Sequence, residues 1–144
     1  MNPSDFMDTA SRLLAPSRSE SDLRSSISRA YYACYQTIRI EVNTHMSIQL
    51  RQQAGLGGKI LDHGKLCMAL KGCNTTADIG THLENLKTAR HSADYDLAKV
   101  IDFRKADDNV NDAKALLAEI SVLGGAAKVV QILRAHLQAI HGML

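Results

Sequence analysis

The stretch Ser21–His45 constrains the fold more than any other part of the chain, because neither proline nor glycine interrupts its 25 residues. Its apolar residues recur at steps of three or four, the spacing of one helix face, and show no period-two alternation. A helix of this length would extend roughly 35 Å, about the width of a small domain. We therefore expect a long central helix whose buried face comprises Leu23, Ile27, Tyr31, Cys34, Ile38 and Val42.

The rest of the chain also shows helical patterns separated by short loops. Asn2-Pro3 has the residues of a helix start, with Asn as N-cap, and Thr81 with Glu84 forms a capping box that predicts a second start. No segment has a strand pattern and no repeat is present. The sequence predicts an all-α fold of five or six helices in one domain spanning residues 1–144, with helices at about 3–15, 21–45, 62–71, 81–94, 105–123 and 126–143.

The last expected helix has a regular apolar seam that a partner or a second copy of the chain would be able to cover. It comprises Ala126, Val130, Leu133, Leu137, Ile140 and Leu144. We therefore treat residues 126–144 as a terminal helix and a candidate interface element.

Composition narrows the class of protein. The chain is 45% apolar and 22% charged, as in ordinary globular domains, and no apolar run approaches the ~20 residues that span a bilayer. The first residues, MNPSDFMD, lack the basic and apolar regions of a signal peptide, and three cysteines is an odd number. We expect a cytoplasmic protein with reduced thiols and no membrane association.

Net charge is +2, and the basic surplus lies in the front of the chain, where residues 12–51 carry six Arg against three acidic residues. Such a bias permits nucleic-acid binding without requiring it. His63 and Cys67 are one helical turn apart, but no Cys-x-x-Cys pair supports them, so we expect neither a metal site nor a cofactor.

The segment Thr88–Asp96 contains the strongest candidate site residues. Arg90 shares a helix face with Leu83, Leu86 and Ala93, which places its guanidinium at the edge of the core, and Asp94 is one turn further on. One interpretation is a structural Arg90–Asp94 pair that ends the helix. The other is an anion site in which Arg90 holds a phosphate while His91 or Tyr95 transfers a proton or donates a hydrogen bond.

Arg29 and Tyr32 on the long helix raise the same question. They are three residues apart and lie at the border of the apolar face, while Tyr31 lies on that face. The border is either solvated surface or part of a nucleic-acid-binding site.

The two segments together resemble a known family. Ser28-Arg29-Ala30-Tyr31-Tyr32-Ala33 on a long second helix, followed by Arg90-x-x-Ala93-Asp94-Tyr95, is similar to the HEPN domain (higher eukaryotes and prokaryotes nucleotide-binding), in its small stand-alone prokaryotic branch. The similarity covers residues 5–123. It implies an all-α domain that forms a homodimer and binds or cleaves RNA or a nucleotide. It also implies a setting in toxin–antitoxin or phage-defence systems, with a nucleotidyltransferase-type antitoxin as partner.

Catalytic members of this family are metal-independent ribonucleases that carry Arg-x(4–6)-His on the fourth helix. In this chain Arg90 matches the arginine, but the positions that follow four to six intervening residues hold Tyr95, Asp96 and Leu97, with no histidine. The general acid–base is therefore missing, because His91 lies about 100° round the helix from Arg90 and a phenol such as Tyr95 is a poor base at neutral pH. The candidate catalytic residues are Arg90, Asp94, Tyr95 and His91, the candidate nucleic-acid contacts are Arg29, Tyr32 and Arg90, and catalysis stays open. The alternative is a non-catalytic interaction domain that docks a partner through the last helix.

Overall fold

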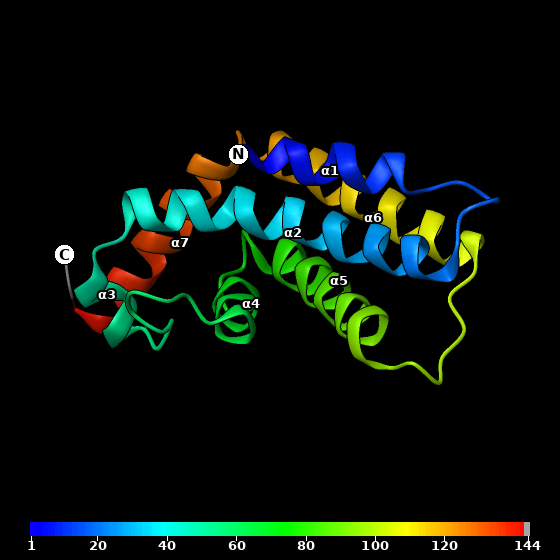
Figure 1. Cartoon of the computed structure of the whole chain (residues 1–144). Coiled ribbons are helices and arrows are strands. Elements are labelled where there is room, and N and C mark those ends of the chain that lie inside the picture. The colour runs from blue at the N-terminus through cyan, green and yellow to red at the C-terminus, as the bar shows by residue number, and fades with distance from the viewer. Residues whose placement is uncertain (143–144) are drawn as a thin grey trace. The chain divides into compact units, whose positions relative to one another are not determined.

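The computed structural model describes residues 1–142, which form seven α-helices and no strand (Figure 1). The expected all-α fold is confirmed. The helices are α1 (Pro3–Arg12), α2 (Glu20–His45), α3 (Ile48–Gln53), α4 (His63–Lys71), α5 (Ala77–Tyr95), α6 (Phe103–Val122) and α7 (Ala126–His141). The number exceeds the expected five or six because α3, a short helix capped by the Ser47 side chain, is a separate element.

The long helix α2 follows its sequence pattern closely. All six residues of the predicted apolar face are buried, with Tyr31, Cys34, Ile38 and Val42 fully so. The Ser19 hydroxyl accepts a hydrogen bond from the Asp22 backbone N–H at 3.1 Å and caps the first turn. Burial raises the pKa of the Cys34 thiol to about 12, because the thiolate would lose its solvation, and the thiol donates to the Ala113 carbonyl at 3.3 Å.

The helices pack into two compact units, each built from two separate stretches of chain. Unit 1 comprises Met1–Gln36 and Asn85–Leu117, and unit 2 comprises Thr37–Glu84 and the described residues from Ala118 onward. Helices α2, α5 and α6 each continue along the chain from one unit into the other.

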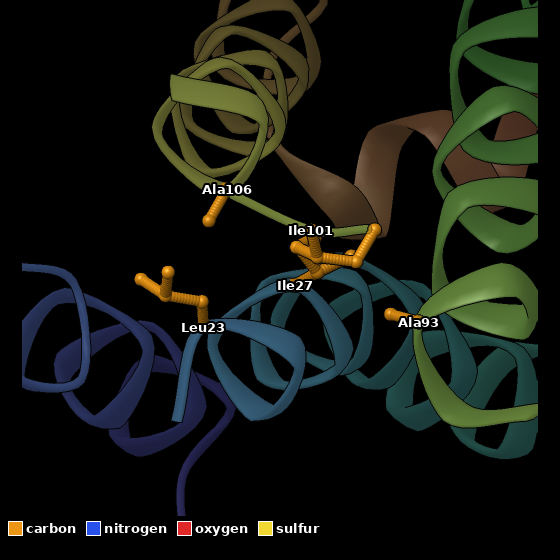
Figure 2. Close-up of a cluster of buried hydrophobic side chains, with 5 residues drawn as sticks. All are labelled: Leu23, Ile27, Ala93, Ile101 and Ala106. Atoms are coloured by element: carbon orange, nitrogen blue, oxygen red, sulfur yellow. The ribbon is translucent and has the colours of Figure 1, made fainter. Parts of the chain in front are cut away.

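Unit 1 has an apolar cluster that joins the start of α2 to the end of α5 and the start of α6. Figure 2 shows its buried members: Leu23 and Ile27 of α2, Ala93 of α5, Ile101 of the connection between α5 and α6, and Ala106 of α6. In the same unit the Ser26 hydroxyl, fully buried on α2, donates to the Ala10 carbonyl of α1 at 2.8 Å. The apolar cluster packs the end of α5, where the candidate site residues lie, against the start of α2.

Helix α5 begins earlier than the sequence pattern predicts. The capping box at Thr81 is wrong, since α5 starts at Ala77 and Thr81 lies inside it. Gly80, which suggests a loop, is instead a helical residue in close contact with α4. A Cβ there would lie 2.6 Å from the backbone nitrogen of Lys71. Glu84, the expected capping residue, pairs with the Lys71 ammonium at 3.1 Å. Glycine is needed here for the close approach of two helices rather than for a break.

The last helix uses most of its predicted seam inside unit 2. Val130, Leu133 and Leu137 are buried, together with Val129, whereas Ile140 is 61% exposed, so the seam is covered only in part within the described residues. Leu144 lies outside the described residues. No single helix in residues 1–142 is long and apolar enough to cross a membrane. Only α6 and α7 counted together, across the bend that separates them, reach that length and composition.

Candidate arginine–aromatic site

Unit 1 brings the two sequence motifs into contact. Arg90 of α5 places its guanidinium carbon 5.4 Å from the centre of the Tyr31 ring and 5.6 Å from that of Tyr32, both on α2. The two rings are edge-to-face, with centroids 5.3 Å apart. A guanidinium over aromatic faces is attracted by their quadrupoles, by about 0.5–2 kcal/mol per pair depending on desolvation. Arg90 therefore packs on the central tyrosines of α2.

The expected pairing of Arg90 with Asp94 is present but weak. One guanidinium nitrogen lies 3.5 Å from the Asp94 carboxylate, which is at the outer limit of a hydrogen bond. The same carboxylate oxygen accepts from the Ser28 hydroxyl of α2 at 3.3 Å. Ser28 of α2 and Arg90 of α5 therefore share the Asp94 carboxylate as a hydrogen-bond acceptor.

Arg90 has hydrogen-bonding capacity that its neighbours do not use. Its Nε is buried and has no hydrogen-bond partner within residues 1–142, and the side chain as a whole is 14% exposed. A guanidinium carries several N–H donors in a planar fork, and here only the long bond to Asp94 uses one of them. An anion reaching the exposed edge of Arg90 would meet unused donors.

A second arginine extends this site. Arg29, which is exposed, lies with its guanidinium carbon 5.9 Å from the centre of the Phe6 ring of α1, and Phe6 in turn lies 6.1 Å from the Tyr32 ring. Phe6 is a member of the site that the sequence analysis did not find, because nothing in the sequence indicates that α1 lies beside Tyr32. We call Phe6, Ser28, Arg29, Tyr31, Tyr32, Arg90 and Asp94 the arginine–aromatic cluster.

His91 and Tyr95 form a separate pair on the exposed side of α5. Their ring centroids are 4.9 Å apart, His91 is exposed and Tyr95 is 66% exposed. Neither is in a contact with Arg90 that the structure records for the described part of the chain. Within one copy of the chain, the geometry thus gives no support to proton transfer by His91 or Tyr95 at a phosphate held by Arg90.

Arg24 holds the end of α5 in place, and the sequence analysis did not single it out. Its guanidinium donates to four backbone carbonyls at and beyond the end of that helix: Ser92 at 3.3 Å, Ala93 at 3.0 Å, Asp96 at 3.0 Å, and Lys99. The last carbonyls of a helix lack partners within it and carry partial negative charge, so an arginine is well suited to this position.

Glu20 completes this arrangement. Its carboxylate accepts from the Ile101 backbone N–H at 2.8 Å and lies 3.4 Å from Arg24. The Ile101 hydrogen bond, assisted by the Arg24 charge, lowers the pKa of Glu20 below its ordinary value of 4.5. Arg24 and Glu20 together fix the turn that follows Tyr95.

No group of three or more His, Cys, Asp or Glu side chains in residues 1–142 is placed to hold a metal ion. Comparison of the chain with protein-family models, with curated proteins and with solved structures finds no match.

Proposed function

We propose that the chain is a HEPN-like module that binds RNA or a nucleotide through the arginine–aromatic cluster. The observation that carries the proposal is the state of Arg90, whose guanidinium lies over two tyrosine rings while its Nε has no acceptor among residues 1–142. A planar guanidinium matches the oxygens of a phosphate in a bidentate manner. Its attraction to the rings also limits the entropy that would be lost when a phosphate binds.

The surroundings of Arg90 favour a phosphate that belongs to a nucleic acid or a nucleotide. Arg29 supplies a second, exposed positive charge, and Phe6 and Tyr32 are both partly exposed aromatic residues on which a base would stack. Tyr31 is fully buried, so its contribution is to support Arg90 rather than to contact a base. Asp94 opposes anion binding, but its long bond to Arg90 is easily exchanged.

Binding is the primary proposal and metal-independent cleavage is its extension. Cleavage needs a general acid or base beside the phosphate, and the nearest histidine in sequence, His91, is paired with Tyr95 instead. The homodimer, the nucleotidyltransferase-type partner and the defence setting enter through the resemblance alone. The alternative of a docking domain that uses the last helix is less favoured, because Leu133 and Leu137 are buried within unit 2.

The test is RNA binding by fluorescence anisotropy, using labelled single-stranded RNA at several salt concentrations. We expect Arg90→Met to weaken binding by about tenfold or more, as for loss of one charge-assisted contact. Lys114→Met is the matched control, because it removes one positive charge from an exposed site in unit 1 and introduces the same side chain. Equal affinities for wild type, Arg90→Met and Lys114→Met would refute the proposal.

Cleavage is measured on the same proteins with labelled tRNA in the presence of EDTA. Cleavage by wild type and not by Arg90→Met establishes a ribonuclease, and His91→Gln then tests whether His91 acts from a second copy. Binding without cleavage leaves a non-catalytic module. Circular dichroism of each variant confirms that the loss is not unfolding.

A further inference from the structure

Unit 2 contains a cleft of about 530 Å³ that the proposed function does not use. It lies between the end of α2, the α3 segment and α7, and its polar lining residues are Asn43, Thr44, His45, Ser47, Arg51, Arg134 and Gln138. Its volume is within the range of small-molecule sites, about 300–1,000 Å³. The lining includes two arginines and a histidine and no acidic residue.

Arg51 is the unusual residue of this cleft. It is only 6% exposed, yet no carboxylate pairs with it anywhere in residues 1–142. Its one recorded hydrogen bond runs from Nη1 to the Asn43 side-chain oxygen at 2.9 Å, and its Nε is buried with no acceptor. Burying a charge without a counter-ion is strongly unfavourable, so native proteins normally pair it.

The surrounding protein compensates this charge only in part. The end of α2 contributes the partial negative charge of a helix C-terminus, about half an elementary charge. Glu41 is the nearest acidic residue in sequence, but it pairs with His45 at 3.1 Å and is not part of the lining. Arg134 adds a further exposed positive charge from α7. The cleft is therefore an electropositive site.

We propose that this cleft binds a small organic phosphate, with Arg51 as the buried anchor of the phosphate and Arg134 as a second contact at the rim. Two arginines without an acidic neighbour match the double charge of a phosphate monoester better than a single carboxylate. The volume greatly exceeds that of an inorganic anion, and Met46, Ile48 and Leu50 supply apolar lining for the rest of the ligand. This site is separate from the arginine–aromatic cluster of unit 1 and does not depend on the proposed function.

The experiment is calorimetric titration of the full chain with ribose 5-phosphate and AMP, and with ribose and adenosine as phosphate-free controls, supported by thermal unfolding. We expect both phosphate-bearing probes to bind at millimolar concentration or below and to raise the Tm, with no response to ribose or adenosine. Arg51→Met abolishes the response to ribose 5-phosphate, the deciding probe, because AMP is a nucleotide that the arginine–aromatic cluster is also proposed to bind. Without ligand, Arg51→Met unfolds at the same temperature as wild type or higher, because an uncompensated buried charge is gone and exposed Asn43 can bond to water.

Further variants separate this proposal from a merely structural role of Arg51. Arg134→Gln, an exposed substitution that leaves the fold intact, weakens binding roughly tenfold, as for one charge-assisted hydrogen bond. Lys128→Gln removes an exposed charge from the same helix outside the cleft and leaves binding unchanged. Arg90→Met binds ribose 5-phosphate normally, which distinguishes this site from the arginine–aromatic cluster.

Three results would overturn the proposal. One is the absence of any response to ribose 5-phosphate and AMP, and another is equal binding by wild type, Arg51→Met and Arg134→Gln. The third is an equal response to succinate, which would show a carboxylate site instead. If Arg51→Met does not fold, Arg134→Gln alone decides between these outcomes.

Discussion

Replacement of Arg24 by methionine should destabilise the end of α5 without removing any proposed ligand contact. Methionine keeps the apolar stem of Arg24, so the change removes only the guanidinium. The Arg24 side chain is 11% exposed. The Ala93 and Ser92 carbonyls are part-buried, and loss of their shared charged donor, which is the more distant from Ser92 at 3.3 Å, costs about 2 kcal/mol for the two together. Asp96 and Lys99 are exposed, so water replaces their donor at about 0.5 kcal/mol each. The ion pair with Glu20 is solvent-screened and contributes little.

The sum is about 3 kcal/mol, which corresponds to a fall in Tm of roughly 6–12 °C for a chain of this size. Urea unfolding followed by circular dichroism measures this value for Arg24→Met against Lys114→Met, which should match wild type within about 0.5 kcal/mol. Hydrogen exchange should also accelerate at the Ile101 amide, which Glu20 holds. Arg24→Lys keeps the charge but lacks the fork that reaches several carbonyls, so we expect an intermediate loss.

Two results would refute this reasoning. If Arg24→Met and Lys114→Met have the same stability, water satisfies the α5 carbonyls as well as the guanidinium does. If Arg24→Met lowers RNA binding as strongly as Arg90→Met while remaining folded, Arg24 acts in binding rather than in holding the helix end.

Three further predictions concern pH and packing. Because burial raises the pKa of Cys34 to about 12, the folded state keeps a proton that the unfolded chain loses from about pH 9 upward. The unfolding free energy should therefore fall by about 1.4 kcal/mol per pH unit between pH 9 and 12, and Cys34→Ala, measured by urea unfolding over that range, should lack this term. The pKa of Glu20 is lowered, so its stabilisation is present above pH 4.5 and is lost as the pH falls below that value; acid unfolding of Glu20→Gln should show a shallower pH dependence. Gly80→Ala should lower stability by about 1–3 kcal/mol despite the better helix propensity of alanine, since its Cβ would lie 2.6 Å from the backbone nitrogen of Lys71. Gly72→Ala, where a Cβ meets nothing closer than 3.5 Å, is its control, and equal thermal stability of the two variants would contradict the close-packing argument.

The local features of the fold were predictable from the sequence. The extent of α2 and its buried face follow from a run without proline or glycine in which apolar residues recur every three to four positions. Residues at that spacing lie on one face of a helix. The start of α1 at Asn2-Pro3 and the start of α4 after Asp62 follow from capping chemistry, which involves neighbours in sequence. The end of α5 at Tyr95 lies one residue beyond the predicted end at about residue 94.

Features that depend on a neighbouring helix were not predictable. The pattern around Gly80 favours a loop, and only the approach of α4 explains why a glycine is needed within a helix there. Ile140 continues the spacing of the α7 seam, but it is exposed because no segment of residues 1–142 covers it. Periodicity indicates which face of a helix is apolar, and packing decides how far along the helix that face is buried.

The candidate site divides in the same way. The sequence alone determines that Arg90 and Asp94 share a helix face, since they are one turn apart, and that Tyr31 lies in the core. Only the tertiary structure places Arg90 on the tyrosines of α2, Phe6 beside Tyr32, and the Arg24 guanidinium on the end of α5.

The burial of Arg51 without a carboxylate is likewise a tertiary fact. The physical reason is common to all these cases. Spacing within a helix fixes which residues share a face, whereas the charge and apolar surface that meet that face come from segments that are remote in sequence.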